Sequence, residues 1–268
     1  MSTAAAFTGD IPKIYDSHLG PVLFEYYGQH LAQKLAALHP NHVLKVACGT
    51  GIDTRATKTA IPNARVVATD LNPDMLKVAE AKFLPGEVEF KVVDCQELPF
   101  PDASFDAVAC QFGIMFVPDK DKALQEAMRV LQPGGILVCS VWEGLEANPA
   151  SNVTEQLIQD TCHTDPPRFL HTPYGFFDRI ELKSLFERNG FVNVELEDVK
   201  TEVPFDAARF AHGVVFGTPA FAQLNEHPEV ELGSFTTELS KRMEEFSKTT
   251  GGKAPLHAIF VSGQKSRE

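Results

Sequence analysis

Residues 43–51 of the chain read Val43-Leu44-Lys45-Val46-Ala47-Cys48-Gly49-Thr50-Gly51. The short apolar run is typical of a buried β-strand, and the closing glycines predict a tight turn directly after it. The residues from Asp53 to Ala60 then predict a short helix that stops before Pro62. A strand, a glycine turn and a helix in this order indicate an α/β fold, in which ligands bind at the carboxyl ends of the strands.

Strands and helices alternate on the carboxyl side of this unit. Further strands are expected at 64–69, 88–93, 105–112, 136–142, 191–199 and 256–262. Helices are expected at 73–83, 119–131 and 181–189. This alternation predicts a parallel sheet with helices on both faces. The regular apolar and polar alternation of 191–199 predicts a strand near the edge of the sheet.

The composition narrows the class of protein. The chain has 268 residues, 44% of them hydrophobic, and a formal net charge of -12, so we expect a globular protein without nucleic-acid partners. The longest nearly apolar run, 107–117, is too short to span a bilayer. The N-terminus shows no secretory signal, so we expect a cytoplasmic protein without membrane insertion. The chain has five cysteines, an odd number, and no two of them have C-x-x-C spacing, so no metal site or disulfide framework is predicted.

Three segments do not fit the alternating core. We expect one domain over 1–268, with its core at about 42–142, 177–199 and 255–264 and cap segments at about 1–41, 143–176 and 200–254. The first cap segment predicts two helices, around 11–18 and 21–37. A helix at 232–247 has an apolar stripe, which we expect to pack into the core. Since this extra sequence leaves the ligand edge of the sheet, it predicts an enclosed pocket for a small molecule.

Acidic residues follow the second and third strands. Asp70 ends the second strand, 19 residues after Gly51, and Asp94 follows the third. A carboxylate at the first place can accept hydrogen bonds from ribose hydroxyls, and one at the second could bind an adenine amino group. A P-loop is excluded, because no G-K-[ST] follows the turn. The dinucleotide fingerprint lacks its third glycine, because position 54 is Thr54, which demotes a nicotinamide-dependent oxidoreductase but leaves it open.

Four ordered segments carry a resemblance to a known family. They are the stretch 43–51, Asp70-Leu71-Asn72-Pro73-Asp74-Met75-Leu76, the block 94–106, and Arg129-Val130-Leu131-Gln132-Pro133-Gly134-Gly135. Together they resemble class I S-adenosylmethionine-dependent methyltransferases, most closely the ubiquinone/menaquinone-biosynthesis-like (methyltransferase type 11) subgroup. The resemblance implies a Rossmann-like fold with a seven-stranded, mostly parallel sheet, helices on both faces and a helical cap. It also implies methyl transfer from S-adenosyl-L-methionine to a small-molecule acceptor.

The resemblance implies cofactor contacts at ten positions. These are Tyr15, Ala47, Gly49, Gly51, Asp70, Leu71, Met75, Asp94, Cys95 and Gln111. Asp70 would hold the ribose hydroxyls, with Leu71 and Met75 flanking the adenine. Asp94 and Cys95 would meet the edge of the adenine.

The remaining implied contacts surround the methionine moiety. Gly49 and Gly51 would line it, with the carbonyl of Ala47 near its amino group, and Gln111 would lie near the sulfonium. Tyr15 would close the cofactor site from the N-terminal segment. The family often has an acidic residue shortly before these glycines, where this chain has Lys45 and Val46.

No catalytic residue is predicted. Four histidines fall in or near the cap segments, and a surface or packing role is expected for each rather than a role as general base: His18, His171, His212 and His257. Ten side chains are candidates for the acceptor pocket, of which about half are expected to be structural: Phe24, Tyr26, Phe112, Met115, Phe116, Phe169, Tyr174, Phe177, Phe210 and Phe216. A non-methylating protein that keeps the fold stays open, as do the acceptor atom and the oligomeric state.

Overall fold

The computed structural model describes residues 7–267, so the expected domain parts at 1–6 and 268 lie outside it. Its centre is a seven-stranded sheet with the order β3-β2-β1-β4-β5-β7-β6. The strands are β1 (His42–Lys45), β2 (Arg65–Asp70), β3 (Glu89–Val92), β4 (Phe105–Gln111), β5 (Leu131–Trp142), β6 (Val192–Pro204) and β7 (Lys253–Gln264). The first five are parallel, and β7 runs antiparallel to both β5 and β6. The predicted seven-stranded, mostly parallel sheet is confirmed.

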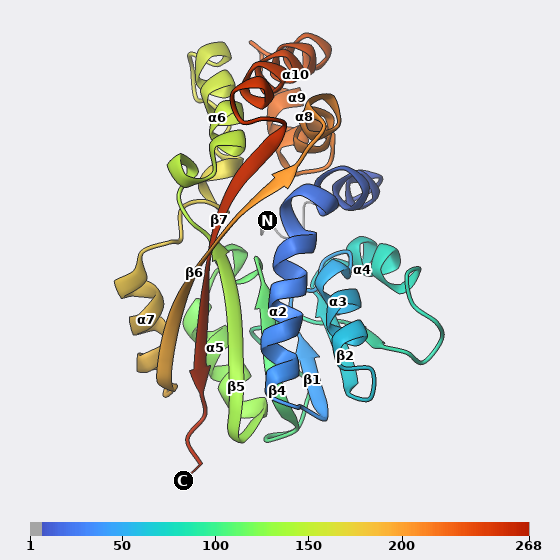
Figure 1. Cartoon of the computed structure of the whole chain (residues 1–268), viewed down its shortest axis with the longest axis vertical. Helices are drawn as coiled ribbons and strands as arrows, with labels where there is room; N and C mark the ends of the chain where they lie inside the picture. Colours follow the sequence, from blue (N-terminus) through green and yellow to red (C-terminus); the bar gives the residue numbers. More distant parts are fainter. Residues whose placement is uncertain (1–6, 268) are drawn as a thin grey trace.

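Helices between the strands cover the sheet. They are α3 (Ile52–Ala60), α4 (Pro73–Glu80), α5 (Lys120–Val130) and α7 (Arg179–Arg188). Local capping explains where they begin: the side chain of Asn72 accepts the N–H groups of Asp74 and Met75, and Asp119 caps α5. Figure 1 shows α2 (Glu25–Ala37) in front of the sheet and α5 behind β5.

A helical layer lies beyond the carboxyl ends of the parallel strands. It consists of α6 (Pro149–Thr161), α8 (Ala207–Phe216), α9 (Ala220–Glu226) and α10 (Leu232–Thr249), gathered at the top of Figure 1. Short 3₁₀ turns at Ile114–Phe116, Leu145–Ala147 and Phe169–His171 lie in the connecting segments. The stripe on α10 packs inward as predicted, because Phe235, Leu239 and Met243 are buried. No helix among residues 7–267 is long and apolar enough to cross a membrane.

The N-terminal segment differs from its prediction. Two helices were expected, but the structure has one unbroken helical run: α1 (Ile11–Ile14), a π-helix η2 (Tyr15–Phe24) and then α2. Pro21, expected at the start of the second helix, lies inside the π-helical part, although a proline within a helix has no N–H to donate. The chain instead continues with wider turns, in which the N–H of Glu25 donates to the carbonyl of Gly20. Such π-helical segments occur frequently at functional sites.

Three strands are longer than predicted. β5 begins at Leu131, because the expected break at 132–135 is an irregularity within the strand: the pairing shifts between Phe105 opposite Leu131 and Ala107 opposite Ile136. β6 and β7 extend each other, pairing from Val192 to Pro204. The long β6–β7 ribbon reaches up into the helical layer in Figure 1. Its length therefore depends on strand pairing and not on local sequence.

Candidate functional site

One cavity lies where the carboxyl ends of β1 to β4 meet. Its lining comes from the segments that follow these strands, within 47–53, 70–75, 93–96 and 111–118, and from the N-terminal segment. It encloses about 960 Å³, including its opening to solvent. The structure places nine predicted cofactor residues in this lining: Tyr15, Ala47, Gly49, Asp70, Leu71, Met75, Asp94, Cys95 and Gln111.

Gly51 is the predicted residue that does not line the cavity. It precedes α3 with a φ of 77°, and a Cβ there would lie 3.0 Å from the Cβ of Ala79 on α4. Its position needs a glycine because of the left-handed backbone and the close approach of α4. The structure thus shows a role for Gly51 in the turn, and its contact with the methionine moiety stays a prediction.

The backbone around the cavity is strained at two residues that are not glycine. Ala47 in the glycine turn has a φ of 51°, and Phe112 after β4 has a φ of 52°. Both residues line the cavity. Left-handed conformations cost non-glycine residues energy and cluster at functional sites. The strain therefore supports the cavity as a site of function.

Asp70 is fixed at the end of β2 by the glycine turn. Its Oδ2 accepts the N–H of Gly49 and its Oδ1 accepts the N–H of Asn72, both at 2.8 Å. Burial raises the pKa of Asp70 above its ordinary value, although these two hydrogen bonds oppose the rise. Each carboxylate oxygen has a further lone pair, so both can also accept hydrogen bonds from a ligand.

Asp53 is a lining residue that our sequence analysis missed. It lies in the first turn of α3 and has a side chain only 6% exposed, with Oδ2 2.6 Å from Nζ of Lys45. Lys45 ends β1 and is completely buried. A lysine within an otherwise apolar central strand needs an acidic partner. That requirement, together with an aspartate one turn into the next helix, was the sequence signal that could have found the pair.

The charge of the cavity has one sign. Asp53, Asp70 and Asp94 line it, and no lysine or arginine belongs to its lining among residues 7–267. In a dinucleotide site, the pyrophosphate binds at the N-terminus of the helix after the glycine turn. Here that turn of helix carries Asp53. The cavity therefore favours a ligand with positive charge over one with phosphates.

Two polar atoms in the lining lack a hydrogen-bond partner within the protein. They are Oγ1 of Thr50 and Oε1 of Gln111, and both are buried. The side-chain nitrogen of Gln111 donates to the carbonyl of Phe24 at 3.3 Å, so the side-chain oxygen of Gln111 remains available to accept a hydrogen bond from a ligand. Buried polar atoms are rarely left unpaired. Their presence fits a cavity that is completed by a polar ligand.

Aromatic side chains from the N-terminal segment form one wall. Tyr15 stacks on Phe24 with ring centroids 4.8 Å apart, and Phe7 contacts Tyr15 edge to face at 5.5 Å. Burial raises the pKa of Tyr15, and the nearby carboxylates of Asp70 and Asp53 raise it further. Tyr15 is therefore a neutral phenol at neutral pH, suited to packing and hydrogen bonding.

A second cavity adjoins the first through this wall. Both are lined by Phe7, Tyr15, Phe24, Phe112 and Phe116. The second encloses about 560 Å³, including any opening to solvent, and no charged side chain lines it among the described residues. Six of the predicted acceptor-pocket residues line it: Phe24, Phe112, Met115, Phe116, Phe169 and Tyr174. The other four do not, namely Tyr26, Phe177, Phe210 and Phe216.

The cap histidines lie outside both cavities. The rings of His18 and His212 stack at 5.0 Å, and His171 contacts a carboxylate of α6 at 3.0 Å. His257 pairs with Asp198 at 2.6 Å. Each thus has a structural partner, as predicted for these four residues.

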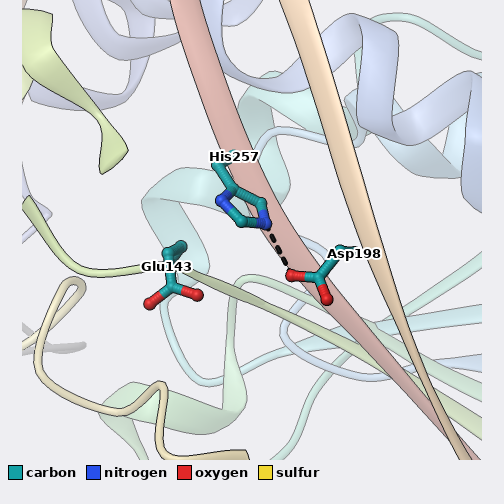
Figure 2. Close-up of side chains that lie close together, drawn as sticks. All are labelled: Glu143, Asp198 and His257. Atoms are coloured by element: carbon teal, nitrogen blue, oxygen red, sulfur yellow. Dashed lines mark hydrogen bonds and ion pairs between the residues drawn. The ribbon is translucent and has the colours of Figure 1, made fainter. Parts of the chain in front are cut away.

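A separate polar cluster consists of Glu143, Asp198 and His257, shown in Figure 2. Their potential ligand atoms lie within 4.8 Å of one another, a spacing that a metal ion could use. However, Arg179 at the start of α7 pairs with Glu143 at 2.8 Å and also with Asp198. Since the guanidinium already supplies the positive charge between the two carboxylates, we interpret the cluster as an ion-pair network that joins α7 to the sheet.

Comparisons with known proteins agree with this geometry. The profile of a family described as a methyltransferase domain matches residues 44–139. The ubiquinone/menaquinone biosynthesis C-methyltransferase UbiE of Pseudomonas paraeruginosa is 44% identical over 103 residues, which cover 37% of this chain and only 40% of that relative. The YcgJ protein of Bacillus subtilis has a similar fold, with a TM-score of 0.59 at 19% identity over 91% of this chain and 100% of the other.

A longer match covers most of the chain. The demethylmenaquinone methyltransferase of Staphylococcus aureus is 32% identical over 207 residues, which cover 70% of this chain and 84% of that relative. The match therefore includes most of the relative and not only the motifs around the glycine turn. The chain belongs to the class I S-adenosylmethionine-dependent methyltransferases, in the ubiquinone/menaquinone-biosynthesis-like subgroup.

Proposed function

We propose that the protein transfers a methyl group from S-adenosylmethionine to a small, uncharged and largely apolar acceptor. The observation that carries this proposal is the charge of the first cavity, which has three carboxylates and no basic side chain in its described lining. When bound, S-adenosylmethionine supplies an electrophilic methyl group on a positively charged sulfur. A nicotinamide dinucleotide carries a negative pyrophosphate instead, and this lining offers it no countercharge.

In this proposal each group of lining residues binds one part of the cofactor. Asp70 accepts the ribose hydroxyls with the lone pairs that its backbone partners leave free. Leu71 and Met75 pack against the adenine faces, and Asp94 and Cys95 meet its edge. Gln111 has an unpartnered amide oxygen, which we place toward the sulfonium.

The lining of the second cavity supports this acceptor class. Its polar groups include the hydroxyls of Ser151 and Tyr174, which hydrogen-bond to each other at 2.6 Å. Burial raises the pKa of Tyr174 to about 12, so this phenol stays neutral. An apolar aromatic acceptor with one or two polar groups suits such a site. The names of the relatives, which concern quinone biosynthesis, agree with this class.

The protein's contribution to methyl transfer is alignment and exclusion of water. The aromatic side chains shared by the two cavities, with Tyr15 and Phe112 among them, hold donor and acceptor in adjoining spaces. Fixing two reactants in line removes much of the entropic barrier. No histidine lines either cavity in the described chain, so we propose that no histidine acts as general base.

Binding and transfer assays test the proposal separately. Calorimetry is expected to show saturable binding of S-adenosylhomocysteine, while titration with NADH is expected to give no saturable fluorescence change. Transfer of labelled methyl groups is then measured to short-chain naphthohydroquinones and to a charged amine, phosphoethanolamine. Binding of NADH instead of S-adenosylhomocysteine would refute the methyltransferase, and methylation of phosphoethanolamine alone would refute the acceptor class. Cofactor binding without transfer to any acceptor would indicate a protein that keeps the fold but does not methylate.

The partners, the domain organisation and the location of the protein stay predictions. A net charge of -12 supports small molecules over nucleic acids as partners. We propose a single capped domain, because core and cap segments alternate along the chain, and a cytoplasmic location.

A further inference from the structure

A buried ion pair lies directly behind the glycine turn. Nζ of Lys45 and Oδ2 of Asp53 are 2.6 Å apart. Lys45 is completely buried and does not belong to the lining of the cavity, whereas Asp53 does. A buried charge is tolerated when it is paired. Lys45 therefore neutralises the charge of Asp53 from the protein interior, while the carboxylate of Asp53 lines the cavity.

The three lining carboxylates differ in how far their oxygens are already used. Both oxygens of Asp70 accept backbone N–H groups at 2.8 Å. Oδ1 of Asp94 accepts the backbone N–H of Gln96 at 2.8 Å, and both its oxygens lie 3.0 Å from the side-chain amide of Gln96.

Asp53 keeps more acceptor capacity than the other two carboxylates. Beyond its ion pair with Lys45, its one hydrogen bond is a long one, from the hydroxyl of Thr54 to Oδ1 at 3.5 Å. A carboxylate offers about four lone-pair sites. Oδ1 of Asp53 is therefore the most available negatively charged acceptor in the lining.

We propose that Asp53 accepts a hydrogen bond from the ammonium group of the methionine moiety, an assignment that rests on the proposed function. The ammonium is a charged donor with three N–H bonds, like that of a lysine, and it needs acceptors near the glycine turn. In this chain a lysine ends β1, where the family often has an acidic residue. Relative to that pattern, the two charges have changed places: the acidic residue, Asp53, lies in the first turn of α3, and the basic residue, Lys45, lies at the end of β1.

The test compares two ligands that differ in the amino-acid moiety. S-adenosylhomocysteine carries the ammonium, and 5′-methylthioadenosine lacks it. In Asp53→Asn, affinity for S-adenosylhomocysteine is expected to fall by about 10- to 100-fold, the range for a hydrogen bond to a charged group. Affinity for 5′-methylthioadenosine is expected to stay within about twofold of the original protein. The matched control Asp94→Asn, at the adenine edge, is expected to weaken both ligands alike.

A second variant guards against misfolding. Asp53→Asn leaves Lys45 buried without its partner, which is destabilising, whereas Lys45→Met together with Asp53→Asn removes both charges. The double variant is expected to fold and to show the same loss of discrimination between the two ligands. An equal loss for both ligands, or unchanged affinity for S-adenosylhomocysteine, in either variant would overturn the assignment. If the original protein bound neither S-adenosylhomocysteine nor S-adenosylmethionine, the proposed function itself would fail.

Discussion

Replacing Asp70 by alanine tests the cofactor site most directly. The carboxylate has two oxygens oriented by the backbone N–H groups of Gly49 and Asn72, and we propose that it accepts two ribose hydroxyls. Hydrogen bonds to a charged group contribute about 1.5–3 kcal/mol each. Two bonds at the lower end total about 3 kcal/mol, so Asp70→Ala is expected to weaken binding of S-adenosylhomocysteine roughly 100-fold or more.

The assay must separate lost ligand contacts from lost stability, because Asp70→Ala also leaves two backbone N–H groups without their acceptor. Asp106 provides a matched control at the opposite end of the sheet. Its Oδ2 accepts the backbone N–H groups of Asn41 and His42, both at 2.7 Å, and it does not line the cavity.

Calorimetry at one temperature, with urea unfolding of the same preparations, gives both quantities. Asp106→Ala is expected to lower the free energy of unfolding without changing affinity for S-adenosylhomocysteine. Unchanged affinity in Asp70→Ala would refute the role of this carboxylate. If both variants weakened binding equally, the loss in Asp70→Ala would be an effect of stability.

Three further changes probe the turn, the second cavity and the surface. Gly51→Ala is expected to lower the free energy of unfolding in urea by about 1–3 kcal/mol, because position 51 combines a left-handed backbone with a close approach to α4. Gly49→Ala should cost less, because a Cβ at position 49 meets no atom within 4 Å. Equal losses in the two variants would contradict the contribution assigned to the contact with α4. Val214→Phe, which narrows the second cavity only, is expected to raise the KM of the acceptor in methyl-transfer assays and to leave S-adenosylhomocysteine binding unchanged, and weakened cofactor binding would argue against separate subsites. Hydrogen bonds from Arg188 and then from the neighbouring Asn189 lower the pKa of Asp121 to about 2, so this group stabilises the fold above about pH 4 and its contribution is lost as the pH falls toward 2. In urea unfolding at several pH values, Asp121→Asn is expected to reduce the loss of unfolding free energy over that interval by less than about 1 kcal/mol, because the pair is exposed. Identical acid profiles of the two proteins would contradict this prediction.

The elements around the glycine turn were predictable because their signals are local. Asn72 and Asp119 cap the helices that follow them, and short-range capping can be read from neighbouring residues. The strand ends that carry Asp70 and Asp94 follow directly from the apolar runs. Parallel topology then brings these ends to one edge of the sheet, which is why most of the predicted lining residues meet in one cavity.

The errors arose where distant residues act on the backbone. The π-helical part of the N-terminal run includes Pro21, which by local rules predicts a break. The ends of β6 and β7 depend on their pairing over 192–204 with 253–264.

The amino-acid sequence alone determined the fold class, the order of the strands along the chain and the cofactor, S-adenosylmethionine. These follow from apolar periodicity and from motifs a few residues long. Tertiary structure decided which charges face the cavity. The buried Lys45 of β1 is compensated by Asp53 of α3, eight positions later. Only the tertiary structure shows that the acid lines the cavity whereas the base does not. Burial and direction of a side chain depend on neighbours from several elements, so no local pattern contains them.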